Sequence, residues 1–138
     1  MCGSSSPKYQ RTFVVVFRPA EERRWWANFI DKKYGHCFLA TYIDDKQCVV
    51  IDPSEGGIGF YVHQVPLIRK IWEYRKNGWE TIIYTVVGED MVRPRMKFFR
   101  TCVGICKDFL GVDAWWIITP KQLYKEVSKC LFCSEATK

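Results

Sequence analysis

The residues best suited to chemistry in this sequence lie between Thr101 and Gly111. The pattern predicts a helix with Thr101 as its N-cap and Gly111 as its C-terminal stop. Cys102 would then occupy the first helical position, where unpaired N–H groups and a partial positive charge favour a thiolate. Because the thiolate is the nucleophilic form of cysteine, Cys102 is the candidate nucleophile.

A cysteine nucleophile needs a base, and the chain contains two histidines, His36 and His63. His36 opens a strand-like run over residues 36–43, and a rigid strand is a suitable support for a catalytic imidazole. We therefore take Cys102 and His36 as the pair to test. The structural alternative is that Cys102, like Cys106 one turn later, is a small buried residue of an amphipathic helix.

The group that would orient His36 depends on the length of one turn. The polar residues 44–46 predict an antiparallel hairpin between the strand at His36 and a second strand over residues 48–52. If the turn holds three residues, Asp52 lies diagonal to His36 on the same face and is its natural partner. If it holds two, Asp52 changes face and Glu55 lies opposite His36. A third interpretation makes Asp52 an Asx cap of a turn.

The remaining pattern predicts an α+β fold with a central antiparallel sheet and packed helices. The predicted segments are a strand over 10–17, a short helix over 21–30, an extended stretch over 56–63 led by a glycine loop, a helix over 67–77, a strand over 81–87 near the sheet centre, a connection over 89–100, a short strand or buried segment over 114–118, and a last helix from Thr119 and Pro120 to about Lys129. Residues 10–129 would form a single α+β domain, between a flexible N-terminal tail over 1–9 and a polar C-terminal tail over 130–138.

The order of these parts resembles one known family. A Gly-His strand, a strand ending in an acidic residue, a Thr-Cys-Val helix and a closing Thr-Pro-x-Gln-Leu-Tyr helix resemble the permuted branch of the NlpC-type, papain-like cysteine hydrolases, particularly small bacteriophage-encoded members. The likeness spans roughly residues 34–127. It implies a permuted papain-like topology and a peptidase or amidase activity, with Cys102 as nucleophile, His36 as base and Asp52 as the orienting group.

Lecithin:retinol acyltransferase-like enzymes share this order of parts. This chain has Thr-Cys-Val-Gly where they have Asn-Cys-Glu-His, which argues against lipid acyl transfer. The resemblance implies a peptide or amide substrate, in a host or virion protein or in peptidoglycan. No cofactor and no metal are required.

Composition sets the expected class and location. The chain has 138 residues, a net charge of +6 and an odd number of cysteines, seven, at positions 2, 37, 48, 102, 106, 130 and 133. Buried thiols in a reducing cytosol explain this usage better than a disulfide framework. The N-terminal residues have no apolar core typical of a signal peptide, and no apolar run is long enough to span a membrane. We expect the host cytoplasm or the virion, with no membrane partner.

Three weaker motifs suggest other functions. Cys130 and Cys133 have the spacing of a zinc ligand pair, which would need further ligands such as Cys106 or His63. Cys2 would become N-terminal after methionine removal, as in N-terminal-nucleophile amidotransferases. Residues 23–26 and 93–100 combine arginines with aromatic residues, a pattern that suits nucleic acid. The alternative to a hydrolase is thus a catalytically silent phage protein: a virion component, or a binding protein for nucleic acid or a host protein.

Overall fold

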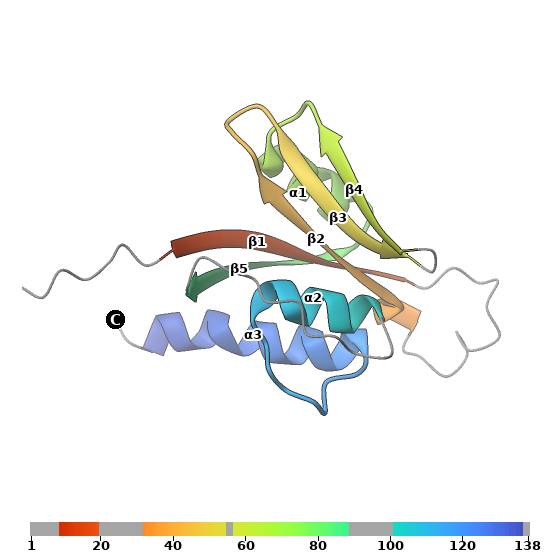
Figure 1. Ribbon diagram of the computed structural model, residues 1–138, viewed down its shortest axis with the longest axis vertical. Helices are drawn as coiled ribbons and strands as arrows, with labels where there is room; N and C mark the ends of the chain where they lie inside the picture. The colour runs from red at the N-terminus through yellow and green to blue at the C-terminus, as the bar shows by residue number, and fades with distance from the viewer. Residues whose placement is uncertain (1–8, 20–31, 55–56, 89–100, 137–138) are drawn as a thin grey trace, which may run out of the picture.

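The structure is an α+β fold, as the sequence predicts. The computed structural model describes residues 9–19, 32–54, 57–88 and 101–136, with the side chains of the last helix described as far as Lys129. These residues form a five-stranded antiparallel sheet, in the order β4-β3-β2-β1-β5, and three α-helices (Figure 1). The elements are β1 (Tyr9–Arg18), the short 3-10 helix η2 (Lys32–Tyr34), β2 (His36–Tyr42), β3 (Cys48–Ser54), β4 (Gly57–His63), α1 (Leu67–Lys76), β5 (Glu80–Gly88), α2 (Cys102–Leu110) and α3 (Pro120–Ala136).

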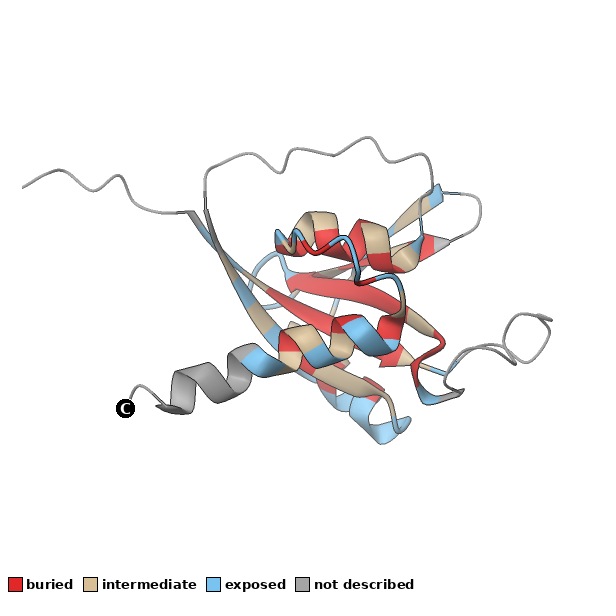
Figure 2. Cartoon of the chain, turned by 90° about the horizontal axis from the view of Figure 1, so that it is seen from below, coloured by how far each residue is buried: buried red, intermediate tan, exposed pale blue. Residues whose placement is uncertain are grey.

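The strand β1 divides the hydrophobic core into two parts. Phe13, Val15 and Phe17 pack with residues of α2 and α3, whereas Val14 and Val16 pack with residues of α1. Successive strand residues point to opposite faces, so this β-branched and aromatic run fills both sides of the sheet. The helices α2 and α3 therefore cover one face and α1 the other, and the buried residues lie between them (Figures 1 and 2).

The strand β5 lies at an edge of the sheet, and the prediction that residues 81–87 lie near its centre is wrong. In the described residues β5 pairs with β1 alone. Ile82 is buried in the core, but its neighbour Ile83 is 48% exposed. The β-branched residues that suggested a central strand are thus buried on one face of β5 only. The central, doubly buried strands are β1 and β2.

The segment between α2 and α3 is a turn, and the predicted strand over 114–118 does not form. The buried Lys107 donates hydrogen bonds from Nζ to the carbonyl oxygens of Ala114 (2.6 Å) and Ile117 (3.0 Å). These two residues are buried, as the alternative of a buried segment expected, while the intervening Trp115–Trp116 pair is exposed. The ammonium group of Lys107 therefore takes the place of a strand neighbour as the partner of these carbonyl groups.

The helix α3 begins at a capping box. The backbone N–H of Gln122 donates to Thr119 Oγ1 (3.3 Å), and the backbone N–H of Thr119 donates back to Gln122 Oε1 (3.0 Å). The helix continues to Ala136, so the prediction of an end near Lys129 is wrong. Neither glycine nor proline follows Pro120 in this stretch, and nothing in the local sequence stops the helix.

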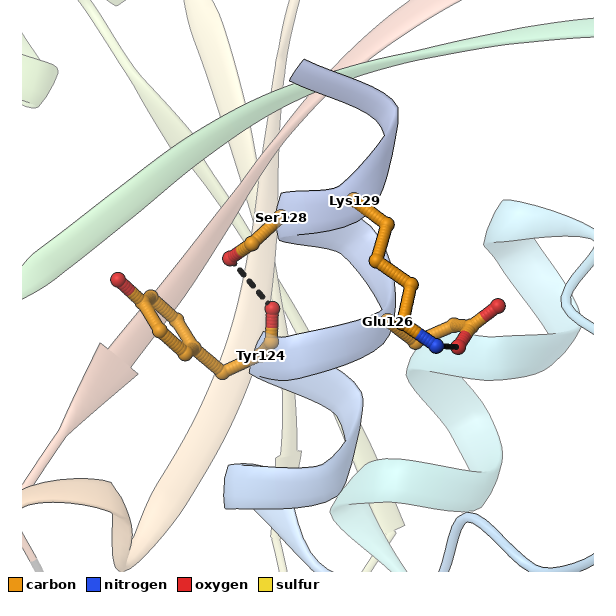
Figure 3. Close-up of polar contacts among 4 residues, drawn as sticks. All are labelled: Tyr124, Glu126, Ser128 and Lys129. Atoms are coloured by element: carbon orange, nitrogen blue, oxygen red, sulfur yellow. Dashed lines mark hydrogen bonds and ion pairs between the residues drawn. The ribbon is translucent and has the colours of Figure 1, made fainter. Parts of the chain in front are cut away.

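Figure 3 shows the last side chains of α3 that the structure describes. Ser128 donates from Oγ to the carbonyl oxygen of Tyr124 (2.6 Å), and Lys129 forms an ion pair with Glu126 (3.2 Å). Tyr124 also packs edge-on against Phe17 in β1, with ring centroids 5.4 Å apart. One side of α3 is thereby anchored to the sheet.

Two further predictions meet different outcomes. The helix over 67–77 is confirmed as α1, but only Ile71 and Tyr74 of that helix are buried, while Ile68 and Trp72 of the predicted apolar stripe are exposed. The helix over 21–30 and the connection over 89–100 lie outside the described residues.

Candidate functional site

The start of α2 has the local structure that its sequence predicts. Thr101 has extended backbone angles (φ −96°, ψ 161°), and its Oγ1 accepts a hydrogen bond from the backbone N–H of Gly104 (3.0 Å). Cys102 is the first residue of the helix. Gly111 ends it in the left-handed conformation (φ 69°), which glycine adopts without steric cost.

The β2–β3 hairpin has the three-residue turn. The backbone N–H of Ile43 donates to the carbonyl oxygen of Gln47 (2.9 Å), so residues 44–46 form the turn. The pairing continues regularly to Leu39 opposite Ile51. This register places Asp52 on the same face as His36 and excludes the two-residue turn that would have brought Glu55 opposite His36. Glu55 itself lies outside the described residues.

A direct hydrogen bond joins His36 to Asp52. The two atoms, His36 Nε2 and Asp52 Oδ1, are 2.7 Å apart, and the side chains are 19% and 30% exposed. Both residues lie beyond Leu39 and Ile51, the last backbone pair of β2 and β3. A carboxylate only accepts, so Nε2 carries the proton of this bond, and in a neutral ring Nδ1 is left as the basic nitrogen.

The pKa of His36 reports its contacts with two groups. Burial lowers this pKa, but hydrogen bonds with the Cys102 thiol and the Asp52 carboxylate outweigh it, and the pKa lies above its ordinary value. Cys102 therefore lies close enough to the imidazole to affect its pKa. Of the three residues that the sequence singled out, His36 and Asp52 are joined by a hydrogen bond, and Cys102 contributes to the raised pKa of the imidazole.

The pKa of Cys102 departs from expectation. The hydrogen bond with the Cys37 thiol and burial raise it well above the ordinary value, while His36 and a backbone hydrogen bond from Cys37 lower it. The raising effects are the larger, so the helix start does not by itself produce a resting thiolate. The interaction with His36 opposes this rise without cancelling it, so the Cys102 thiol is protonated at neutral pH.

Sequence reasoning missed Cys37. This residue follows His36 in β2 and points to the opposite face of the sheet, toward the core beneath α2. Cys102 interacts with both residues at the beginning of β2, which β3 does not pair. The only sequence signal was the adjacency of Cys37 to the candidate base.

The weaker sequence motifs gain no support. Within the described residues, no group of three or more His, Cys, Asp or Glu side chains is placed to hold a metal ion. Cys106, a suggested zinc ligand, lies buried beside Cys37. The side chains of Cys130 and Cys133, residue Cys2 and the basic aromatic segments 23–26 and 93–100 lie outside the described residues. No helix in the described part is long and apolar enough to cross a membrane.

Comparison of the chain with protein-family models, with curated proteins and with solved structures found no match. The family resemblance therefore rests on the motifs of the sequence alone.

Proposed function

We propose that this protein is a cysteine hydrolase of the peptidase or amidase class. Cys102 is the nucleophile, His36 the general base and Asp52 the group that orients the imidazole. The observation that carries the proposal is the 2.7 Å hydrogen bond between His36 and Asp52, made by an imidazole that also interacts with a cysteine at a helix start. Enzymes that transfer acyl groups through a cysteine commonly place it beside a histidine that a third group orients.

The topology supports a permuted papain-like arrangement as part of this proposal. The histidine strand β2 precedes the cysteine helix α2 in the chain, and the sheet is antiparallel with α2 packed on one face. The first turn of α2 lies near the beginning of β2 in Figure 1. This is the order that the sequence resemblance implies.

In the first chemical step, His36 takes the Cys102 proton on Nδ1 as the sulfur attacks the substrate carbonyl carbon. The carbonyl electron pair moves to oxygen, and the backbone N–H of Cys102, in the first turn where N–H groups lack intrahelical acceptors, is the expected donor to that oxyanion. Asp52 stabilises the imidazolium through Nε2. Because the pKa of the resting thiol is raised, proton transfer and attack occur together and no stored thiolate is needed.

Collapse of the tetrahedral species breaks the bond to the leaving group, which takes the proton from His36. A thioester on Cys102 remains. Water then attacks the thioester with His36 again as base, and the thiol regains its proton as the acid product leaves. The substrate class is a peptide or amide carbonyl compound.

Thiol labelling tests the nucleophile directly. The folded protein is treated with limiting iodoacetamide at neutral pH, and the modified cysteines are mapped by mass spectrometry. Cys102, partly exposed and beside a base, should react before the buried Cys48 and Cys106. If Cys48 is modified as fast as Cys102, the assignment of the nucleophile is wrong.

Hydrolysis of p-nitrophenyl acetate tests acyl transfer without knowledge of the natural substrate. The wild-type protein should release a burst of about one nitrophenolate per protein molecule. An acetyl group should then be found on Cys102. Cys102→Ala should give no burst, whereas Cys48→Ala, at a buried cysteine of β3, should keep it. A burst that survives Cys102→Ala would place the chemistry elsewhere.

The second candidate is a binding protein without catalysis. It is favoured by the exposed aromatic side chains of the described residues, among them Trp72 in α1 and Trp115, which is 84% exposed. A protein of this kind would bind its partner through these residues, and Cys102→Ala would leave binding intact. Absence of the acetyl burst from the wild-type protein, together with binding of a protein partner, would favour this function.

A further inference from the structure

Three of the four described cysteines form a cluster, which we call the thiol cluster: Cys37, Cys102 and Cys106. Cys37 lies in β2, and the other two lie one turn apart in α2. Cys37 and Cys106 belong to the core beneath α2, and Cys102 packs against that core from its partly exposed rim. The other two thiols both affect the pKa of Cys37, and all three cysteines are free.

The proposed hydrolysis uses only one of these three thiols. Cys37 is fully buried, and the mechanism above leaves it without a chemical role. Its position is nevertheless specific, because it is the cysteine of β2 in the core against which Cys102 packs, and the two thiols affect each other's pKa. A thiol held against a reactive cysteine is the arrangement of a resolving residue in reversible thiol oxidation.

We propose that Cys102 is a site of reversible oxidation, with Cys37 as the resolving residue that closes a Cys37–Cys102 disulfide after a hydroperoxide has oxidised Cys102. This regulation rests on the proposed function, because it uses the same base-assisted sulfur. The disulfide would block hydrolysis and tie β2 to the start of α2.

The chemistry proceeds in two balanced steps. In the first, the Cys102 sulfur, after giving its proton to His36, attacks the terminal oxygen of the hydroperoxide; the S–O bond forms, the O–O bond breaks, and the alcohol (water, for hydrogen peroxide) leaves with the proton of His36. In the second, the Cys37 sulfur attacks the Cys102 sulfur; the S–S bond forms, the S–O bond breaks, and hydroxide leaves as water with the Cys37 proton. Two thiols are oxidised and one peroxide is reduced.

Helix geometry disfavours Cys106 as the partner, which leaves Cys37 within the thiol cluster. Residues four apart on a helix have Cβ atoms about 5–6 Å apart, whereas a disulfide needs about 3.5–4.5 Å. A Cys102–Cys106 bond would therefore distort the first turns of α2. Cys37 approaches from the facing strand, and its burial prevents direct attack by a solvent oxidant, so it reacts only through Cys102.

Peptide mapping of the intact protein tests the proposal. The reduced protein is treated with a small excess of hydrogen peroxide, remaining thiols are blocked with N-ethylmaleimide, and the denatured chain is digested with trypsin without reductant. The expected product joins peptide 34–46 to peptide 101–107, with fragmentation placing the bond between Cys37 and Cys102. Dithiothreitol should restore both the iodoacetamide reactivity of Cys102 and the acetyl burst.

Two variants and one control sharpen the test. In Cys37→Ala, peroxide should drive Cys102 to the sulfinic acid, and dithiothreitol should no longer restore its reactivity. Cys106→Ala should still form the linkage, and it keeps the test decisive if Cys37→Ala fails to fold. The matched control Cys48→Ala, at a buried strand cysteine outside the thiol cluster, should behave as wild type.

The outcomes separate the two proposals. If Cys102 labels rapidly in the reduced protein but peroxide yields sulfinic acid or a Cys102–Cys106 bond in the wild type, the redox proposal is overturned and the hydrolase proposal stands. If Cys102 labels no faster than Cys48 before oxidation, the hydrolase proposal is overturned. If the Cys37–Cys102 linkage then also fails to form, both proposals fail.

Discussion

The two ends of the β2–β3 hairpin contain similar residues in different surroundings. At the turn end, Cys48 in β3 lies opposite His63 in β4, in regular strand pairing. At the open end, His36 and Cys37 begin β2 where pairing with β3 has ceased, and the start of α2 supplies Cys102. Each end thus has a histidine near a cysteine.

What distinguishes the open end is the orientation imposed on its histidine. Asp52 holds one nitrogen of His36, and Cys102 interacts with the ring. At the turn end the pKa of Cys48 is raised, first by burial and then by Glu73, with Lys70 opposing. A cysteine close to a histidine therefore does not by itself define a candidate site. The open end is the candidate site because Asp52 binds one nitrogen of His36 and the start of α2 lies near its ring.

Replacement of the two histidines should give the largest contrast between the ends. His36→Ala removes the group that takes the Cys102 proton, so the acetyl burst and any hydrolysis should fall by about 10³-fold. His63→Ala should change either rate by less than about twofold, since it lies at the turn end. The measurement is burst kinetics with both variants, after circular dichroism has shown that they are folded. Equal losses would mean that the comparison assigns the wrong histidine.

Replacement of aspartates at the two ends should have the next largest effect. Asp52→Asn keeps the size of the side chain but removes the charge that stabilises the imidazolium and fixes its tautomer, so kcat/KM should fall by about 10²-fold or more. The control is Asp44→Asn in the turn, where Oδ1 of Asp44 accepts a hydrogen bond from the backbone N–H of Lys46 (2.7 Å). That variant should lose a little stability and no activity. An Asp52→Asn protein with wild-type turnover would remove Asp52 from the mechanism.

The pH dependence of labelling should reveal the proton transfer at the open end. The pKa of His36 is raised above its ordinary value of 6.5, and a protonated ring cannot accept the thiol proton. The alkylation rate of Cys102 should therefore fall as the pH drops through a midpoint above 6.5 and should level off at higher pH. In His36→Ala, the rate should rise with pH without a plateau, because burial and Cys37 then hold the pKa of the thiol far above neutrality. A plateau that persists in this variant would show that another base serves Cys102.

Local sequence signals predicted the open end well. Thr101, Cys102 and Gly111 define α2 because N-caps and C-terminal glycines act through the backbone of a single turn. The position of Asp52 followed from one assumption, a three-residue turn, since the register of a hairpin then fixes every side chain in it. These inferences needed no knowledge of distant contacts.

Contacts between distant segments escaped sequence reasoning. The meeting of Cys37 with Cys102 depends on how α2 packs on β2, and it reverses the expected direction of the pKa of Cys102. The hydrogen bonds of Lys107 to Ala114 and Ile117 likewise replace a predicted strand with a turn. Composition also could not tell an edge strand such as β5 from a central one, because both bury a β-branched face.

The smallest expected effect concerns the helix cap at the open end. Thr101→Ala removes the acceptor of the Gly104 N–H and should lower the free energy of unfolding by about 1 kcal/mol. The matched control is Thr119→Ala at the start of α3, where Thr119 and Gln122 form the other cap and a similar loss is expected.

The two cap variants should differ at Cys102. Fraying of α2 displaces the first helical residue from His36, so in Thr101→Ala the iodoacetamide rate of Cys102 should change and should lose its plateau with pH. In Thr119→Ala the destabilisation is the same, but α2 keeps its cap, and the labelling of Cys102 should match wild type. Urea unfolding measures the free energy of unfolding of both variants, and alkylation kinetics measure the reactivity of Cys102. If both variants alter Cys102 equally, its reactivity follows global stability, and the start of α2 has no special role in holding it against His36.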